Sequence, residues 1–385
     1  MRITKITPFI VNLSAKSNWF FIRVEGDDDG AAGFGEATLY GWETMQLAYL
    51  EQMSAGLLGL SVEEALPKVR VQPASAGGLV ASSVLSALEQ AMTDAGARSA
   101  GRPVFQTLGT PLRKSVRAYA NINRRTVDRT PAGFMASARD AVAQGYAAVK
   151  IAPFDGVIPD ELGSPESWAH ITAGMERIFA TREAVGPDVH LLVDCHWRFD
   201  EATAAGVLKN LQAAKLFWFE CPISESVENH PALKRLRAVA HTHGTRLAGA
   251  EQQVGVAGFR PFIEGGLYDV VMPDVKYAGG YAEMLRIAEH CQSAGIGFSP
   301  HNPTGPVCTM ASLHLCAVAP GFVMLEHQVG ESPLYYDILR GKHPAVENGC
   351  FEVPDAPGLG IALDEDVMRA HPYQALASVR DPRLG

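Results

Sequence analysis

The stretch from residue 190 to residue 251 contains three short apolar runs, HLLVDC (190–195), KLFWFECP (215–222) and TRLAGAE (245–251). Each run has the aliphatic and aromatic residues that are typical of buried strands. Helix-like sequence separates them, for example over residues 201–213. Strands that alternate with helices in this way indicate a parallel sheet.

The same alternation extends in both directions from this stretch. Five further strand-like runs are VRAYANI (116–122), AAVKIAPF (147–154), YDVVMPDVKYA (268–278), GIGFSPH (295–301) and FVMLEHQ (322–328). Eight such runs with helix-like segments between them predict an α/β fold, a (β/α) barrel over residues 116–348. A doubly wound sheet is the competing fold. That fold normally has a glycine-rich turn after its first strand, and YANINRRT (119–126) contains no glycine.

The first 115 residues follow a different order, with strands before helices. ITKITPFIVNL (3–13), NWFFIRVEG (18–26) and AAGFGEATL (31–39) resemble strands, and an acidic turn at 27–30 joins the last two. Helix-like segments follow near residues 43–57, 62–70 and 80–97. Residues 1–115 therefore predict an α+β domain. We expect the tail, residues 349–385, to pack back onto it.

Composition and charge restrict the functional classes. The chain has 385 residues, of which 47% are hydrophobic, and its formal charge is 33 − 42 = −9. Because it has no basic run, a nucleic-acid or anionic-membrane partner is not expected. The start, MRITKITPFIVNL, lacks the features of a signal peptide. The six cysteines form no CxxC pair, so neither a zinc ribbon nor a disulfide framework is expected, and a cytoplasmic location is the simplest interpretation.

Ionisable residues stand at the end of seven consecutive strand-like runs. They are Lys150, Asp194 with His196, Glu220, Glu251, Asp274 with Lys276, His301 and Glu326. Because catalytic groups of barrel enzymes come from the carboxyl ends of the strands, we expect these side chains to meet at one mouth. An unpaired ion beside apolar sequence is costly, and solubility does not explain the whole set.

Three of these residues, Asp194, Glu220 and Glu251, offer carboxylates from successive strands. An all-oxygen set suits a hard cation such as Mg2+ better than zinc, which favours His and Cys. The alternative is that each carboxylate forms a separate ion pair with a barrel lysine or arginine. By strand alternation, the adjoining Cys195 and Cys221 should point away from the metal into the barrel wall.

His301, in FSPHNPTGP (298–306), is the candidate base. Asp274 stands on the preceding strand, and a carboxylate behind a histidine fixes its tautomer and raises its basicity. Lys150 is a candidate second base or a ligand of a substrate carboxylate, or it is an ion-pair partner of Glu220 or Asp194.

The other strand-end residues each have two possible roles. His196 should face the same side as Asp194, and it either protonates a leaving hydroxyl or forms a supporting hydrogen bond. Lys276 contacts the substrate, or it forms an ion pair with Asp274 or Glu251. Glu326 binds substrate or carries a proton, or it pairs with a buried lysine.

At these residues the sequence resembles the enolase superfamily, in particular the mandelate racemase/muconate lactonizing enzyme type. The most specific pieces are VDCH (193–196), WFECP (218–222), PDVKYAGGYAE (273–283) and FSPHNPTGP (298–306). SALEQAMTDAGARSAGRPVFQTLG (86–109) and PDAPGLGIAL (354–363) resemble the segments that join the family's capping domain to its barrel and return to the cap. The resemblance covers nearly the whole chain. It implies a modified (β/α)7β barrel with an α+β cap built from the N-terminal third and the C-terminal tail.

The resemblance implies that Asp194, Glu220 and Glu251 bind Mg2+. It also implies that Asp274 and His301 form the Asp–His dyad of the mandelate racemase branch, whereas the muconate lactonizing branch uses paired lysines. Glu326 corresponds to the family's glutamate on the eighth strand.

Two departures from the family pattern are visible. Lys150-Ile151-Ala152 replaces the frequent Lys-x-Lys of the second strand, which shifts the expected reaction from racemisation toward dehydration. Gly249-Ala250-Glu251 replaces the usual Gly-Glu pair at the third ligand. Asp194-Cys195-His196 resembles the Asp-x-His of sugar acid dehydratases, in which the histidine can act as the acid.

The reaction implied by the resemblance begins with removal of the proton α to a carboxylate. Loss of a β-hydroxyl from an aldonate or aldarate would then give a 2-keto-3-deoxy acid. Racemisation, epimerisation or cycloisomerisation is the alternative within the family. A retaining glycosidase would need two carboxylates about one bond, but the seventh strand ends in His301. A non-catalytic sugar-acid-binding protein is the alternative from another class.

Substrate choice is expected to come from the cap. Asn18-Trp19 in the first loop and Tyr40-Gly41-Trp42 after the third strand are candidates for covering the site. The alternative for both tryptophans is the cap core or a domain interface. Asn121 and Asn123, at the end of the first barrel strand, are candidates for binding substrate hydroxyls. By resemblance, the chain is expected to form a homo-oligomer, a dimer or an octamer.

Overall fold

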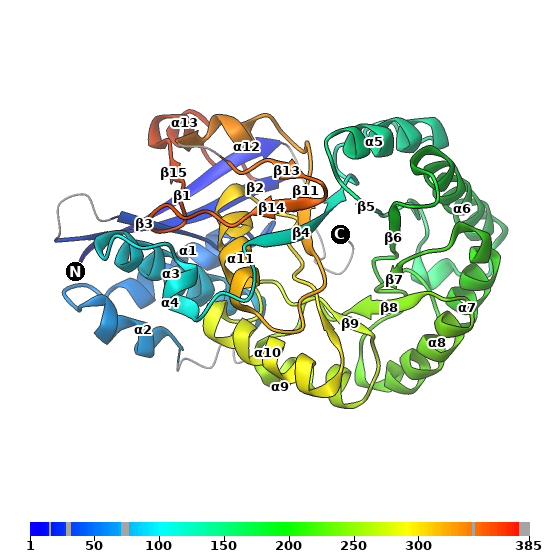
Figure 1. Ribbon diagram of the computed structural model, residues 1–385, viewed down its shortest axis with the longest axis horizontal. Coiled ribbons are helices and arrows are strands. Elements are labelled where there is room, and N and C mark those ends of the chain that lie inside the picture. The colour runs from blue at the N-terminus through cyan, green and yellow to red at the C-terminus, as the bar shows by residue number, and fades with distance from the viewer. Residues whose placement is uncertain (15–16, 28–31, 71–76, 341–342, 377–385) are drawn as a thin grey trace.

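The computed structural model describes residues 1–14, 17–27, 32–70, 77–340 and 343–376, and within them a ring of parallel strands surrounds one axis (Figure 1). The strand order is β11-β4-β5-β6-β7-β8-β9-β10. Phe298 at the end of β10 pairs with Phe322 in a parallel bridge, and Val323 N donates to Phe298 O at 2.8 Å. These contacts close the ring between the last strand and the segment that leads into β11. The predicted barrel is therefore confirmed over the doubly wound sheet.

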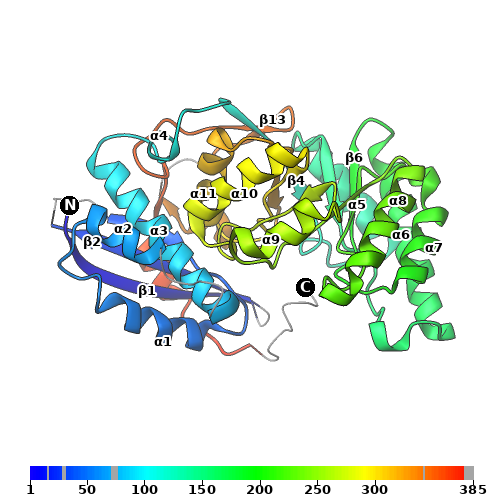
Figure 2. The ribbon, with the colours of Figure 1, turned by 90° about the horizontal axis from the view of Figure 1, so that it is seen from below.

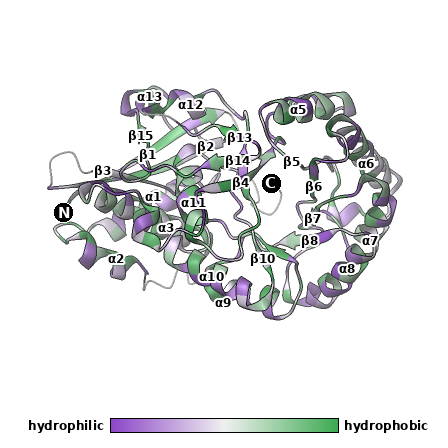
Figure 3. Cartoon of the chain, viewed as in Figure 1, coloured by the Kyte–Doolittle hydropathy of each residue, from purple (hydrophilic) through white to green (hydrophobic). Residues whose placement is uncertain are grey.

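Helices follow seven of the eight barrel strands and lie outside the ring. The elements are β4 (Ser115–Asn121), α5 (Pro131–Ala143), β5 (Ala148–Ile151), α6 (Pro165–Val185), β6 (His190–Asp194), α7 (Glu201–Asn210), β7 (Trp218–Glu220), α8 (His230–Thr242), β8 (Arg246–Gly249), α9 (Gly255–Glu264), β9 (Val270–Val271), α10 (Gly280–Ala294), β10 (Gly297–Phe298), α11 (Pro306–Val318) and β11 (Leu325–Gln328). Most of these helices mix hydrophobic and hydrophilic residues (Figure 3), as one buried face requires. α11 is the exception, since it is buried along its whole length. In the described residues this is the (β/α)7β order that the resemblance implies.

Alternate strand residues face the barrel axis. One apolar cluster consists of Tyr119, Ala148, Leu192, Trp218, Ala248, Val270, Met272 and Met324. The intervening residues, such as Val149, Leu191 and Phe219, belong to a larger core that includes helix residues. Because strand side chains alternate between faces, the first cluster fills the inside of the barrel and the second joins the strands to the helices.

The cap lies beside the barrel, against α10 and α11 (Figures 1 and 2). Its elements are β1 (Ile3–Ser14), β2 (Ser17–Gly26), β3 (Ala32–Glu36), α1 (Glu43–Ser54), α2 (Val62–Arg70), α3 (Gly78–Ser99) and α4 (Phe105–Leu108). The strands pair antiparallel in the order β1-β2-β3. Residues 28–31 of the hairpin turn expected between β2 and β3 lie outside the described residues.

Helix α3 packs directly on β3 because two glycines leave room for it. A Cβ at Gly35 would lie 1.9 Å from Ala87 O, and a Cβ at Gly33 would lie 2.1 Å from Ala91 O. Both distances are far inside van der Waals contact, so only a residue without a side chain fits at either position.

The chain after the barrel contacts both domains. Its elements are α12 (Leu334–Asp337), β12 (Leu339–Arg340), β13 (Val346–Glu347), β14 (Cys350–Glu352), β15 (Ala362–Leu363) and α13 (Glu365–Ala370). β14 pairs antiparallel with β4 of the barrel. α13 contacts β1 of the cap, and Asn12 N donates to His371 O at 2.9 Å. The domain boundaries expected at residues 115 and 348 stay predictions.

In the described part of the chain, every helix is too short or too polar to cross a bilayer.

The close packing of β3 on α3 predicts that Gly35→Ala destabilises the protein. Because the new Cβ meets backbone, we expect a loss of about 1–3 kcal/mol, as for overpacked cores, seen as a lower midpoint in urea unfolding. Gly206→Ala is the matched control, since a Cβ at this helical position has nothing within 4 Å and should be neutral or stabilising by up to about 1 kcal/mol. Equal midpoints for the two variants would contradict the packing argument.

Candidate active site

Polar side chains follow the inward-facing apolar layer at the carboxyl ends of the strands. The pairs, each two residues apart, are Ala148 and Lys150, Leu192 and Asp194, Trp218 and Glu220, Met272 and Asp274, and Met324 and Glu326. The polar member of each pair is buried. Since residues two apart in a strand share a face, all five point inward and meet at one mouth, as barrel active sites do.

The carboxylates of Asp194, Glu220 and Glu251 lie together at this mouth. One oxygen of each lies within 4.8 Å of the others, and all three residues are buried. Glu251 Oε1 is 3.6 Å from His301 Nε2. Burial raises the pKa of Glu251 well above its ordinary value, and the charges of Asp194 and Glu220 raise it further. Within the described residues no lysine or arginine forms an ion pair with Glu251.

This donor set fits a hard divalent cation. The buried carboxylates at the mouth, which are Asp194, Glu220, Glu251, Asp274 and Glu326, outnumber the buried ammonium groups of Lys150 and Lys276 by five to two. Clustered carboxylates that lack enough counter-charge are unstable as ions in a low-dielectric interior. A divalent cation on the three neighbouring carboxylates would offset this excess, and oxygen ligands are those that Mg2+ prefers.

Lys150 lies between two carboxylates. Its Nζ is 2.7 Å from Glu220 Oε1 and 2.7 Å from Glu326 Oε1, with Asp194 Oδ2 further away at 3.9 Å. Burial lowers the pKa of the ammonium group, but Glu220 and Glu326 reverse this and hold the pKa well above its ordinary value. Lys150 therefore forms the ion pair with Glu220 that was one of its expected roles. Glu326 forms the expected pair with a buried lysine.

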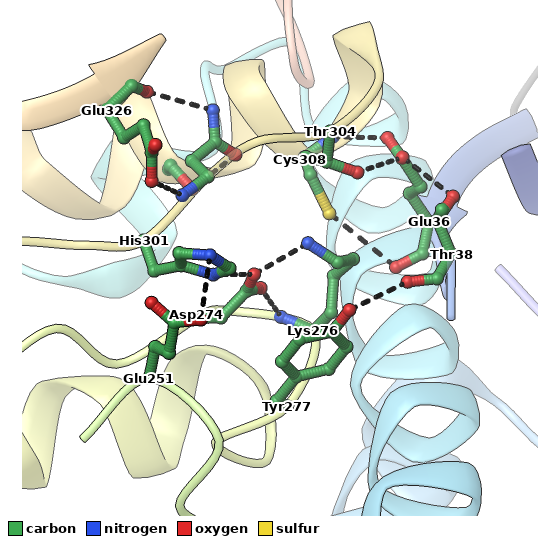
Figure 4. A network of polar contacts seen from close by, with 12 residues as sticks. Glu36, Thr38, Glu251, Asp274, Lys276, Tyr277, His301, Thr304, Cys308 and Glu326 are labelled. Atoms are coloured by element: carbon green, nitrogen blue, oxygen red, sulfur yellow. Dashed lines mark hydrogen bonds and ion pairs between the residues drawn. The ribbon is translucent and has the colours of Figure 1, made fainter. Parts of the chain in front are cut away.

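His301 and Asp274 face each other (Figure 4). His301 Nδ1 is 2.9 Å from Asp274 Oδ2, and the same oxygen accepts from Lys276 Nζ at 2.7 Å. Burial tends to raise the pKa of Asp274, but Lys276 and His301 outweigh it and hold the pKa below its ordinary value. An ionised Asp274 keeps the histidine proton on Nδ1, which leaves Nε2 able to accept another. Nε2 is the atom that faces Glu251.

The backbone beside the three carboxylates is left-handed at residues other than glycine. The φ angles are 48° at His196, 56° at Trp197, 44° at Cys221 and 70° at Ala250. This region costs an L-residue about 1–2 kcal/mol, and such strain concentrates at functional sites. At Ala250 the turn explains how Glu251 reaches the mouth although it follows the inward-facing Ala248 by three residues instead of two.

The expected orientation of Cys221 is wrong. Its Sγ lies 3.9 Å from Glu251 Oε2 and 3.9 Å from Glu225 Oε1, because the left-handed backbone interrupts strand alternation. Cys195, in contrast, belongs to the core between strands and helices. Glu225 itself is a residue that the sequence did not indicate. It accepts from Ala250 N at 2.7 Å and from Tyr268 Oη at 2.8 Å, and so holds the turn before Glu251.

A cavity of about 660 Å³ opens over the carboxylates. The predicted site residues that line it are Asn121, Asn123, Lys150, Asp194, His196, Glu251, Lys276 and His301. His196 Nε2 is 2.9 Å from Asp194 Oδ2. Asn121 Nδ2 donates to Glu326 Oε1 at 2.7 Å, and Asn123 Oδ1 accepts from Arg129 Nη1 at 2.9 Å. Both asparagines are therefore held by neighbours at the cavity wall.

Three predicted substrate residues do not line this cavity in the described structure. Trp19 is 1% exposed and packs against Phe21 and Tyr335. Asn18 is buried and donates to Gln374 O at 3.0 Å. Trp42 stands at the start of α1. Trp19 and Asn18 therefore match the alternative of a cap core or domain interface, and Trp42 is half-buried outside the cavity lining.

Tyr40, two residues before Trp42, is a cap residue that does reach the cavity. Its hydroxyl accepts from Arg124 Nη1 at 2.7 Å, and the same nitrogen is 2.8 Å from Glu331 Oε2. The Arg124 guanidinium lies over the Tyr40 ring, 4.9 Å from its centroid. All three residues line the cavity, as does Arg198. The aromatic loop was visible in the sequence, but which of its rings turns inward was not.

Two family models match the chain. The mandelate racemase/muconate lactonizing enzyme N-terminal domain matches residues 2–109, and the enolase C-terminal domain-like model matches residues 133–367. Together they span the cap and most of the barrel.

Curated relatives and solved structures agree with these matches. The chain is 30% identical to a D-xylonate dehydratase of Haloferax volcanii over 368 residues, which are 92% of this chain and 85% of the relative. It is 27% identical to a D-galactonate dehydratase of Ralstonia pickettii over 374 residues, with 95% and 93% covered. A mandelate racemase/muconate lactonizing enzyme-like protein from Rubrobacter xylanophilus aligns with a TM-score of 0.84 at 29% identity, over 98% of this chain and 99% of that one. The chain is therefore an enzyme of the enolase superfamily and belongs to its mandelate racemase/muconate lactonizing enzyme family.

Proposed function

We propose that the protein is a Mg2+-dependent sugar acid dehydratase. It removes the proton α to the carboxylate of an aldonate-type substrate, expels the β-hydroxyl as water and yields a 2-keto-3-deoxy acid. The observation that carries the proposal is the setting of His301, whose Nδ1 is 2.9 Å from Asp274 while its Nε2 is 3.6 Å from Glu251. A general base beside a cation-binding carboxylate set is what proton removal next to a carboxylate requires.

Asp194, Glu220 and Glu251 would hold the cation, whose positive charge, when bound, stabilises the negative charge that develops on the substrate carboxylate. Lys150 adds a second positive charge at the same place, because Glu220 and Glu326 hold its ammonium group there. Both effects lower the cost of a dianionic intermediate in a buried site.

The residues move two protons in this scheme. His301 Nε2 accepts the α-proton, and the electrons of that C–H bond form a double bond between the α carbon and the carboxylate carbon, which gives an enediolate. The carboxylate then re-forms as these electrons make a double bond between the α and β carbons and the β-hydroxyl departs. The leaving hydroxyl takes a proton from His196 or from the protonated His301 and becomes water. The resulting enol tautomerises to the 2-keto acid, so the net change is loss of one water.

The names of the relatives support the dehydration of aldonates, since D-xylonate, D-gluconate and D-galactonate dehydratases are among them. Epimerisation is the competing outcome, because reprotonation of the same intermediate on its opposite face would invert the α carbon without loss of water. The cytoplasmic location and the homo-oligomer, dimer or octamer, stay predictions.

We predict that wild-type enzyme with Mg2+ forms a 2-keto-3-deoxy acid from at least one aldonate in a panel, measured as the semicarbazone, and that His301→Asn does not. Loss of a general base should reduce kcat by about 10²–10⁴-fold, and α-proton exchange with D2O, followed by NMR, should fall with it. His371→Asn, at an exposed histidine, should leave both rates unchanged. Undiminished exchange in His301→Asn would remove His301 from the role of base.

Removal of the metal should abolish turnover. We expect EDTA to inactivate the enzyme and excess Mg2+ to restore it. Glu251→Gln should weaken Mg2+ binding, measured by calorimetry, by about tenfold or more, since even outer-shell changes cost 10–100-fold. The exposed Glu289→Gln serves as the control. Turnover that survives EDTA would contradict the proposal and favour a metal-independent carboxylate pair of the glycosidase kind.

A further inference from the structure

Glu36, at the end of cap strand β3, places its carboxylate on a helix of the barrel. Oε1 accepts from Gly305 N at 2.9 Å and from the hydroxyl of Thr304, and Oε2 accepts from Cys308 N at 3.0 Å. These donors belong to the first turn of α11 and the residues just before it (Figure 4). The side chain is 0% exposed. A residue of one domain therefore caps a helix of the other.

The absence of a side chain at Gly305 makes this contact possible. It precedes α11 as the capping residue, yet no side chain of its own caps the helix. A Cβ at Gly305 would lie 2.8 Å from Glu36 Oε1, so the glycine makes room for the carboxylate. Glu36 occupies the place where a Ser or Asp cap ordinarily sits, and its negative charge is favoured there by the helix dipole. In the described residues no lysine, arginine or histidine pairs with it.

The segment that Glu36 holds carries the candidate base. His301 stands four residues before Gly305, and the chain between them is fixed from two sides. Asn302 N donates to Glu326 Oε2 at 2.9 Å and Asn302 Nδ2 donates to Thr309 Oγ1 at 3.1 Å on the barrel side. Glu36 holds the other end. A barrel carboxylate and a cap carboxylate therefore both hold the segment that directly follows His301.

A second cap carboxylate stands at the helix that follows the Asp274 loop. Glu89, on α3, is 1% exposed and its Oε1 is 2.6 Å from Arg70 Nε. A Cβ at Gly280, the first residue of α10, would lie 2.0 Å from Glu89 Oε2. Gly280 has a φ of 80°. The cap therefore reaches the first turns of both helices that follow the two members of the Asp–His dyad.

We propose that Glu36 is a positioning residue for His301, so that seating of the cap on the barrel and alignment of the base are one event. The proposal rests on the role of His301 proposed above. Its physical basis is that the base stands on a short loop whose far end is fixed by a side chain of the cap. If the contact with Glu36 is weakened, the imidazole of His301 can shift relative to the substrate, although every group that touches the substrate is still present.

The test compares Glu36→Gln with wild type. The amide keeps the size of the side chain, but its nitrogen cannot accept an N–H, so one of the two backbone contacts is lost. We expect kcat to fall about 10–100-fold, the usual cost of a misplacement near 1 Å, while KM and Mg2+ affinity stay unchanged. Hydrogen exchange of the amides in 299–309 should become faster, and Glu36→Asp should recover part of both effects.

Asp94→Asn is the matched control. Asp94, on α3, is also a buried carboxylate of the cap. It accepts from Leu359 N at 2.8 Å and from Phe34 N of β3 at 3.0 Å, and not from a dyad loop. We expect a lower Tm with unchanged kcat and unchanged exchange at 299–309. Wild-type kcat or unchanged loop exchange in Glu36→Gln would overturn the proposal, and so would an equal loss of kcat in Asp94→Asn.

A double variant covers the case in which Glu36→Gln fails to fold. Gly305 has φ −75° and ψ 179°, a conformation that a capping serine adopts. The E36A/G305S pair would therefore cap α11 from its own loop. We expect stability to recover but not kcat, and recovery of both would overturn the proposal. If wild type turns over no sugar acid, the proposed function fails, and exchange at 299–309 alone decides whether Glu36 holds the loop.

Discussion

An excess of buried negative charge at the barrel mouth is the constraint on which the site depends. Lys150 holds Glu220 and Glu326, and Lys276 holds Asp274. Glu251 is 6% exposed and has no lysine or arginine partner among the described residues. Burying an unpaired carboxylate is costly, so a site built this way has room for one more positive charge. A divalent cation on Asp194, Glu220 and Glu251 would supply that charge.

The cap contributes to the site in two ways. Tyr40 reaches the cavity and is tied to the barrel by Arg124. Glu36 accepts hydrogen bonds from the start of α11, the helix that follows His301, and its carboxylate fills the space that a side chain at position 305 would need. Tyr40 affects the shape of the cavity, and Glu36 affects the position of the segment that follows His301. Under the proposed function, neighbouring parts of one domain interface would therefore contribute to substrate selection and to alignment of the base.

Strand periodicity explains how much of the site could be predicted from the sequence. Lys150, Asp194, Glu220, Asp274 and Glu326 each follow an inward apolar residue by two, so their meeting at one mouth followed from the alternation of strand side chains. Glu251 and Cys221 break that rule, because left-handed turns at Ala250 and Cys221 reset the register, and such turns at non-glycine residues have no sequence signal. Trp19 and Tyr40 are both aromatic cap residues, and only the tertiary packing decides which one is core. Glu36 was out of reach because its partner Gly305 is 269 residues away.

The central claim is that Asp194, Glu220 and Glu251 together bind one divalent cation next to His301. Anomalous scattering from crystals grown with Mn2+ in place of Mg2+ tests it most directly, because it locates the ion itself. We predict one strong peak with carboxylate oxygens of all three residues at about 2.0–2.3 Å, close to the distances of Mg2+ ligands. The absence of a peak there at saturating Mn2+, with the protein intact and the three carboxylates still paired only to Lys150, His196 and His301, would contradict it.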